Sequence, residues 1–87
     1  MITTGALTTE IIEMTQGASG RWVRVLDIKD RLGCTAEDLT EAITELLDED
    51  EAFRADAETH RHRLTGWERD EAPMIGGERR HKVAFFW

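Results

Sequence analysis

The sequence of 87 residues is poor in several features, and each scarcity excludes a class of protein. Its single cysteine, Cys34, excludes an internal disulfide. No apolar run approaches the roughly 20 residues that cross a bilayer, and Met1–Ser19 contains no Lys or Arg, so the basic start of a secretory signal is missing. Repeats and linkers are absent too, and this length leaves no room for two cores. We therefore expect a single cytoplasmic domain over residues 1–87, with no membrane partner.

Bases are missing from residues 36–51, a segment that carries eight acids. The flanking segments nearly balance, because residues 1–35 hold four acids and four bases and residues 52–87 hold six acids and seven bases. The middle segment therefore supplies more than the whole net charge of −7. Such a charge repels phosphate and argues against non-specific binding of nucleic acid. The acids are Glu37, Asp38, Glu41, Glu45, Asp48, Glu49, Asp50 and Glu51.

Helical spacing of apolar residues predicts two helices before this segment. The first covers about 6–17, with Thr8 or Thr9 as N-cap and Gly17 or Gly20 as its end. The second is short and covers Asp27–Leu32, where Gly33 supplies the left-handed stop.

The strongest helix begins after Thr35, which is predicted to cap it. Asp38 stands three residues later, as in a variant of the capping box. The acids and the apolar residues fall on separate faces, and the helix should end near Asp48 or Glu49. The face predicted to be buried consists of Leu39, Ala42, Ile43, Leu46 and Leu47.

Three short segments have the composition or the alternation of strands, namely residues 22–25, 53–58 and 82–87. The long connection between the last two should contain a helical turn or two within Thr65–Ala72, capped by Thr65, and then a turn at Gly76-Gly77. We expect Trp22, Phe53, Val83, Phe85 and Trp87 to line the core. Strict alternation leaves Phe86 outside, which suggests a covering helix or a homodimer contact through the C-terminal strand.

The order helix, strand, helix, helix, strand, loop, strand predicts an α+β fold of the winged helix-turn-helix class. It would have three helices and a small antiparallel sheet with a wing. The alternative is a generic α+β domain that packs the same elements differently.

Several motifs occur in an order that resembles small, uncharacterised winged-helix domains of actinobacteria and their phages. They are Trp22-Val23-Arg24-Val25, the helix ending in Leu32-Gly33, Leu64-Thr65 before a short helix, and Ile75-Gly76-Gly77 followed by Arg80-His81. The resemblance covers roughly residues 21–83 and implies the fold, but it carries no reaction. The chain departs from the pattern in its crowded acids at 48–51 and its aromatic end at 85–87.

Bases cluster at both ends of the connection between the second and third strands. If these strands pair, the clusters meet in the wing, where arginine and lysine can contact phosphate or enter a minor groove. The alternative is that Glu68, Asp70, Glu71 and Glu78 neutralise them. The candidate nucleic-acid-binding residues are Arg61, Arg63, Arg79, Arg80 and Lys82.

The acidic helix offers a different candidate surface. A helix that reads the major groove presents Arg, Lys, Asn or Gln, whereas this one presents only Thr40 and Thr44 beside its acids. The face is either a plain solvated one or a surface that docks a basic protein or mimics phosphate. The candidate partner-binding residues are Glu37, Glu41, Glu45 and Asp48.

No constellation of residues points to catalysis. His60 and His62 would share a strand face with His81 not far away, but no carboxylate or thiol is spaced to complete a zinc site. Cys34, in the turn before the acidic helix, suits packing better than nucleophilic attack. We expect a non-enzymatic binding module without a cofactor or a metal. It would be a small regulator of transcription that contacts nucleic acid through its wing, or else a protein-interaction module that uses its acidic helix.

Overall fold

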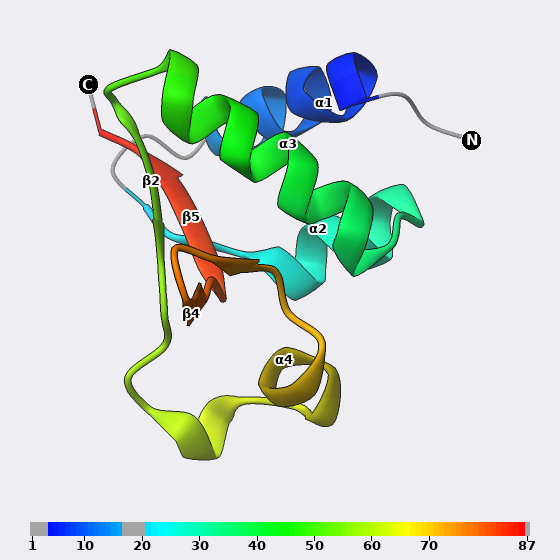
Figure 1. Ribbon diagram of the computed structural model, residues 1–87, viewed down its shortest axis with the longest axis vertical. Helices are drawn as coiled ribbons and strands as arrows, with labels where there is room; N and C mark the ends of the chain where they lie inside the picture. Colours follow the sequence, from blue (N-terminus) through cyan, green and yellow to red (C-terminus); the bar gives the residue numbers. More distant parts are fainter. Residues whose placement is uncertain (1–3, 17–20, 87) are drawn as a thin grey trace.

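The computed structural model describes residues 4–16 and 21–86, and Figure 1 shows how its elements are arranged. The described chain folds into an α+β domain that contains four α-helices and a small antiparallel sheet. In chain order the elements are α1 (Thr4–Gln16), β1 (Val23–Arg24), α2 (Val25–Leu32), α3 (Ala36–Glu49), β2 (Phe53–Asp56), the 3-10 turn η1 (Arg61–Arg63), α4 (Gly66–Asp70), β3 (Met74–Ile75), β4 (Glu78–Arg79) and β5 (Lys82–Phe85).

The long acidic helix α3 forms as its capping signal predicts. The backbone N–H of Asp38 donates to Thr35 Oγ1 over 3.1 Å, and the N–H of Thr35 donates to Asp38 Oδ2 over 3.4 Å. Gly33 ends the preceding helix with a φ of 64°, where its N–H donates to the carbonyl of Lys29. These local contacts confirm the predicted turn, the predicted end of α2 and the predicted start of α3.

The two earlier helices differ in detail from the prediction. Thr8 and Thr9 lie inside α1, not at its start, and their hydroxyls donate to the carbonyl of Gly5. Helix α2 begins two residues early, at Val25, so the first strand shrinks to two residues. The reason is that Val25 is fully buried in the core while its N–H donates to the carbonyl of His81. The predicted stop of the first helix at Gly17 or Gly20 lies outside the described residues.

The main sheet has the strand order β1-β5-β2, with both pairings antiparallel. Strand β5 is therefore central, and its Val83 stands opposite Val23 on one side and Ala55 on the other. The predicted pairing of the second and third strands is confirmed. A dimer that adds a strand to the side of β5 paired with β2 is excluded, because β2 occupies all four of its residues there.

The core lies between the sheet and the helices α1 and α3, which run side by side on one face of the sheet (Figure 1). Phe53 and Phe85 meet edge to face with ring centroids 5.1 Å apart. The expectation for Trp22 is wrong, because 41 % of its surface is exposed. Alternation from the inward Val23 puts Trp22 on the outer face of the sheet, and Trp87 lies outside the described residues. The buried helical residues that complete this core include Leu7, Ile11, Ile28, Leu39, Ile43 and Leu46.

The connection between β2 and β5 builds a small substructure of its own, at the bottom of Figure 1. The hydroxyl of Thr65 caps α4 as predicted, and Glu68 completes a second capping box. Strands β3 and β4 then form a hairpin whose two turn residues, Gly76 and Gly77, have φ values of 65° and 78°. Both positions require positive φ, which explains the pair of glycines. No helix in the described part of the chain is both long and apolar enough to cross a membrane.

Candidate functional site

The outward face of α3 carries the acidic stripe, which consists of Glu37, Glu41, Glu45 and Asp48. All are exposed except Glu45, which is half-buried. Because the opposite face of α3 is anchored in the core, the stripe faces solvent along a helix roughly 21 Å long. Within the described residues, Glu37, Glu45 and Asp48 form no ion pair. The stripe is thus a surface of one charge.

The acids at the end of α3 differ in what they do. Asp50 closes the turn into β2, since its Oδ1 accepts the N–H of Ala52 over 2.9 Å. Asp48 and Glu49 are exposed in the last helical turn, where the partial negative charge of the helix dipole disfavours an acid. The last turn of α3 contains no base to offset them.

The structure places Arg79 and Arg80 in structural contacts, away from the free patch that the wing prediction requires. Arg79 Nη1 donates to the carbonyl of Ala72 over 2.8 Å. Arg80 Nη1 donates to Ala55 O over 2.8 Å, and its Nη2 donates to Ile75 O over 3.1 Å. Both side chains are half-buried. They hold the β3–β4 hairpin onto the rest of the fold.

The other candidate bases lie on different elements. Arg63 is exposed in η1, at the bottom of Figure 1, and the side chain of Arg61 lies outside what the structure describes. Lys82 is half-buried on β5, where its Nζ lies 5.0 Å from the centroid of the Trp22 ring. Among the acids expected to neutralise these bases, Glu78 lies 3.8 Å from Arg80 Nη1, whereas Glu68 pairs with Arg24.

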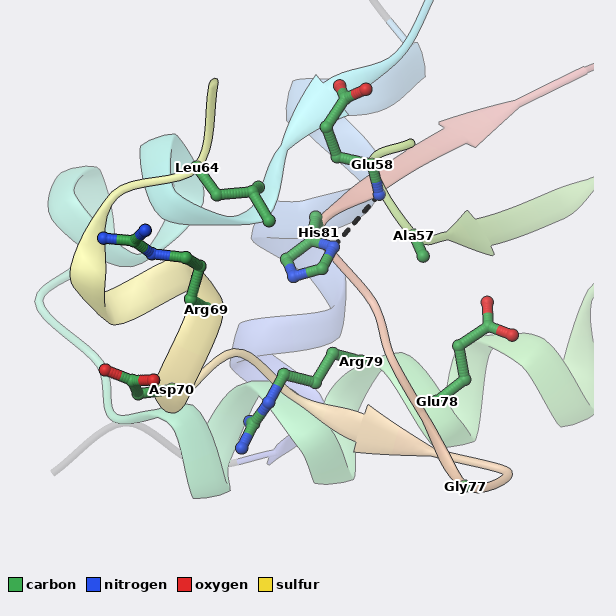
Figure 2. Close-up of a pocket in the computed structure, with 9 residues that line it drawn as sticks. All are labelled: Ala57, Glu58, Leu64, Arg69, Asp70, Gly77, Glu78, Arg79 and His81. Carbon is green, nitrogen blue, oxygen red and sulfur yellow. Dashed lines mark hydrogen bonds between the residues drawn. The ribbon is translucent and has the colours of Figure 1, made fainter. Parts of the chain in front are cut away.

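His81 is buried. Its Nδ1 accepts the backbone N–H of Glu58 over 3.0 Å, the dashed line in Figure 2. This contact leaves the proton on Nε2, which donates to the carbonyl of Glu68 over 2.8 Å. Both ring nitrogens therefore form hydrogen bonds, and His81 joins two segments of the connection. It has no free nitrogen for a metal or for proton transfer.

Glu68 is a buried acid that the sequence analysis named only as one of four acids able to neutralise the wing bases. Its side chain is 2 % exposed, forms an ion pair with Arg24, and accepts the N–H of Thr65 over 3.1 Å. Burial raises the pKa of Glu68, but the contacts with Arg24 and Thr65 outweigh it, so the pKa lies below its usual value. The bond to Glu68 in turn raises the pKa of Arg24. The spacing of Thr65 and Glu68 is the signal that could have identified this acid.

A cleft of about 570 Å³ opens within the connection between β2 and β5, beside α4. Figure 2 shows Leu64 pointing toward the His81 ring, with Arg69 and Asp70 on α4. Acids and bases both line it, and both ring nitrogens of His81 and Nη1 of Arg79 are already bonded within the protein. Its lining residues include no Ser, Thr, Cys or Lys.

The cysteine and the other two histidines are likewise in structural surroundings. Burial raises the pKa of the Cys34 thiol, which favours its unreactive protonated form. His60 and His62 lie at the turn before and within η1, not on a strand face, and Glu58 Oε1 lies 3.2 Å from His60 Nδ1. Hydrogen bonds from the backbone and ring of His60 lower the pKa of Glu58. Among the described residues, no three His, Cys, Asp or Glu side chains gather as a metal site would require.

The outer sheet face is a second surface of note. It consists of Trp22, Arg24, Arg54, Asp56, Lys82, Ala84 and Phe86, which alternate along the strands with the inward residues. Trp22 and Phe86 meet edge to face, with centroids 5.4 Å apart. The exposure expected for Phe86 is confirmed at 45 %.

No protein-family model, curated protein or solved structure matches this chain.

Proposed function

We propose that the chain is a winged helix-turn-helix domain that binds a basic protein partner through the acidic stripe on α3, without catalysis. The element order and the sheet order β1-β5-β2 support the fold, since β1 after the first helix forms one sheet with β2 and β5, which both follow α3. In DNA-binding members of this class of fold, the helix in the position of α3 lies against the target, and the proposal assigns the same exposed face to a protein partner.

The charge of the acidic stripe determines the kind of partner. Carboxylates on this face would meet the phosphates of a duplex with repulsion, whereas they complement lysine and arginine side chains. The single observation that carries the proposal is that the outward face of α3 bears acids and no base, with Glu37, Glu45 and Asp48 free of ion pairs within the described residues.

Contact with nucleic acid through the wing stays a prediction with weaker support. Arg79 and Arg80 would have to give up bonds to backbone carbonyls before they could reach phosphate. Arg63 and Lys82 alone make a small basic surface on separate elements.

A labelled peptide of about ten lysines provides the test, because roughly seven extended residues already span α3. Replacing Glu37, Glu45 and Asp48 by Gln, Gln and Asn should weaken binding roughly 3- to 150-fold at about 50 mM salt, since three surface pairs are lost. The matched control neutralises three exposed acids elsewhere, Glu13, Asp70 and Glu71.

The control protein has the same net charge as the test protein, so only the position of the acids differs. The proposal requires the control to bind nearly as the wild type does. Equal weakening by both variants would show that net charge alone attracts the peptide, and the stripe would be rejected as a site.

A further inference from the structure

The outer sheet face exposes aromatic rings where a small domain would normally hide them. Trp22, Phe86 and Met74 are the large hydrophobic residues with substantial exposure in the described chain, and the first two lie together. Leaving such rings in water forgoes the gain of burial. Two adjacent aromatic side chains on an open sheet therefore form a platform on which flat apolar groups can stack.

Two cations lie beside this platform and form no ion pair within the described residues. Lys82 lies over the Trp22 ring, and the exposed Arg54 donates to the carbonyls of Glu51 and Phe53. The charge of Lys82 also helps to lower the pKa of nearby Glu58. Arg24 also lies on this face, but Glu68 matches its charge.

The register keeps these groups close together. Arg54 stands opposite Ala84, and Lys82 stands opposite both Arg24 and Asp56. Ala84 is fully buried, so the side chains around it close over the centre of the face. Asp56 is the one exposed acid on it, and it lies at the end of β2 away from Phe86.

We propose that the outer sheet face binds single-stranded nucleic acid, with bases stacked on Trp22 and Phe86 and phosphates against Arg54 and Lys82. Stacking on aromatic side chains next to cations is how sheets bind unpaired bases, because every base has a flat face to offer. A duplex keeps its bases stacked internally and could not use the rings. This surface is separate from the acidic stripe.

The overall negative charge does not prevent such binding. Helix α3 packs on the inner face of the sheet, so the acidic stripe and the outer sheet face point in opposite directions. The domain measures 30 × 29 × 23 Å. At physiological salt, charges interact over only about 8 Å, so the distant acids are largely screened.

The test is a titration of labelled oligothymidine and oligouridine at about 50 mM salt, where phosphate contacts are strong. Phe86→Ala and Trp22→Ala should each weaken binding about 5- to 150-fold, the range for losing one stacked base. Met74→Ala is the matched control, because Met74 is exposed on β3 and not on this face. It should bind as the wild type does.

The phosphate contacts have a readout of their own. Arg54→Ala combined with Lys82→Ala should flatten the slope of log affinity against log salt by about 1.4, since each contact with a single strand contributes roughly 0.7. Arg63→Ala combined with Arg69→Ala removes the same charge from exposed positions off this face and should leave the slope nearly unchanged.

Absence of binding at this salt concentration would overturn the inference, and so would equal losses for Phe86→Ala and Met74→Ala. Tighter binding of duplex than of single strand would also overturn it. The variant that neutralises Glu37, Glu45 and Asp48 should bind oligothymidine at least as well as the wild type. Its result separates this inference from the proposed protein partner.

Discussion

Several side chains that look like ligands in the sequence form structural contacts within the fold. His81, Arg79 and Arg80 each direct their polar atoms at the backbone of the long connection, and Glu68 joins that connection to Arg24 on β1. Each bond satisfies a group that would otherwise be unpaired in a half-buried position. Their common result is a β2–β5 connection that is held against the sheet.

Glu68→Gln tests how much the ion pair between Glu68 and Arg24 stabilises the fold. The variant keeps the shape of Glu68 but loses its charge beside Arg24. We expect a loss of about 1–2 kcal/mol at pH 7, the lower part of the range for charged hydrogen bonds, because Arg24 is 48 % exposed. Urea unfolding of the two proteins measures it, with Asp70→Asn on the same helix as the control.

The pH dependence gives a sharper result for the same pair. The pKa of Glu68 is lower in the folded protein than in the unfolded chain, so its stabilisation is present above the unfolded value, about 4.3. It is lost as the pH falls through the folded pKa, where the wild-type carboxyl becomes neutral like Gln. The difference in unfolding free energy between the wild type and Glu68→Gln should therefore become smaller at acidic pH. A gap that stays constant would show that the charge of Glu68 is not what stabilises the fold.

Among the elements, α3 combines two tasks on opposite faces. Its inner face supplies fully buried side chains to the core, and its outer face carries the acidic stripe. The predicted separation of the two faces is confirmed for Leu39, Ala42, Ile43 and Leu46, while Leu47 is only half-buried at the edge. A substitution on the inner face should therefore lower the stability of the fold, whereas one on the outer face should mainly change binding.

Leu46→Ala tests the inner face. It should cost about 2–5 kcal/mol through lost transfer energy and a cavity, which corresponds to a fall in Tm of at least roughly 8 °C for a domain of this size. Leu64→Ala, at a half-buried leucine of the cleft, is the control and should cost less. Thermal unfolding decides the matter. A Leu46→Ala protein that melts within a degree or two of the wild type would contradict the packing of α3.

The whole molecule is electrically polarised. The acidic stripe lies on the helical side, and Arg54 and Lys82, which form no ion pair within the described residues, lie on the outer sheet face. The net charge of −7 thus conceals two surfaces of different character. This arrangement is the common basis of the proposed protein partner and the proposed single-strand surface.

Repulsion among the acids should be visible in stability. Replacing Glu45, Asp48 and Glu49 by Gln, Asn and Gln should leave Tm equal or a few degrees higher, because like charges on one face repel and the last two oppose the helix dipole. Added salt should stabilise the wild type more than this variant, since it screens the same repulsion. Thermal melts at low and high salt measure both effects. A clear loss of stability would mean that these acids bind bases inside the fold.

The local signals in the sequence predicted the elements well because each depends on a few neighbouring residues. Thr35 with Asp38, the positive φ of Gly33 and the Gly76-Gly77 turn are all settled within four residues. Even the outward position of Phe86 follows from alternation along one strand. The same kind of signal places the acids of α3 on one face.

The partner of each long side chain depends on residues far away in the chain, and no local pattern reveals it. Glu68 meets Arg24 across 44 positions, and Arg80 reaches Ala55 across 25. A flexible arginine can serve phosphate or a nearby carbonyl equally well, and only the folded connection brings the carbonyls within reach. For that reason the sequence predicted a basic wing, whereas tertiary packing turned two of its arginines inward and brought Trp22 and Phe86 together on the outer sheet face.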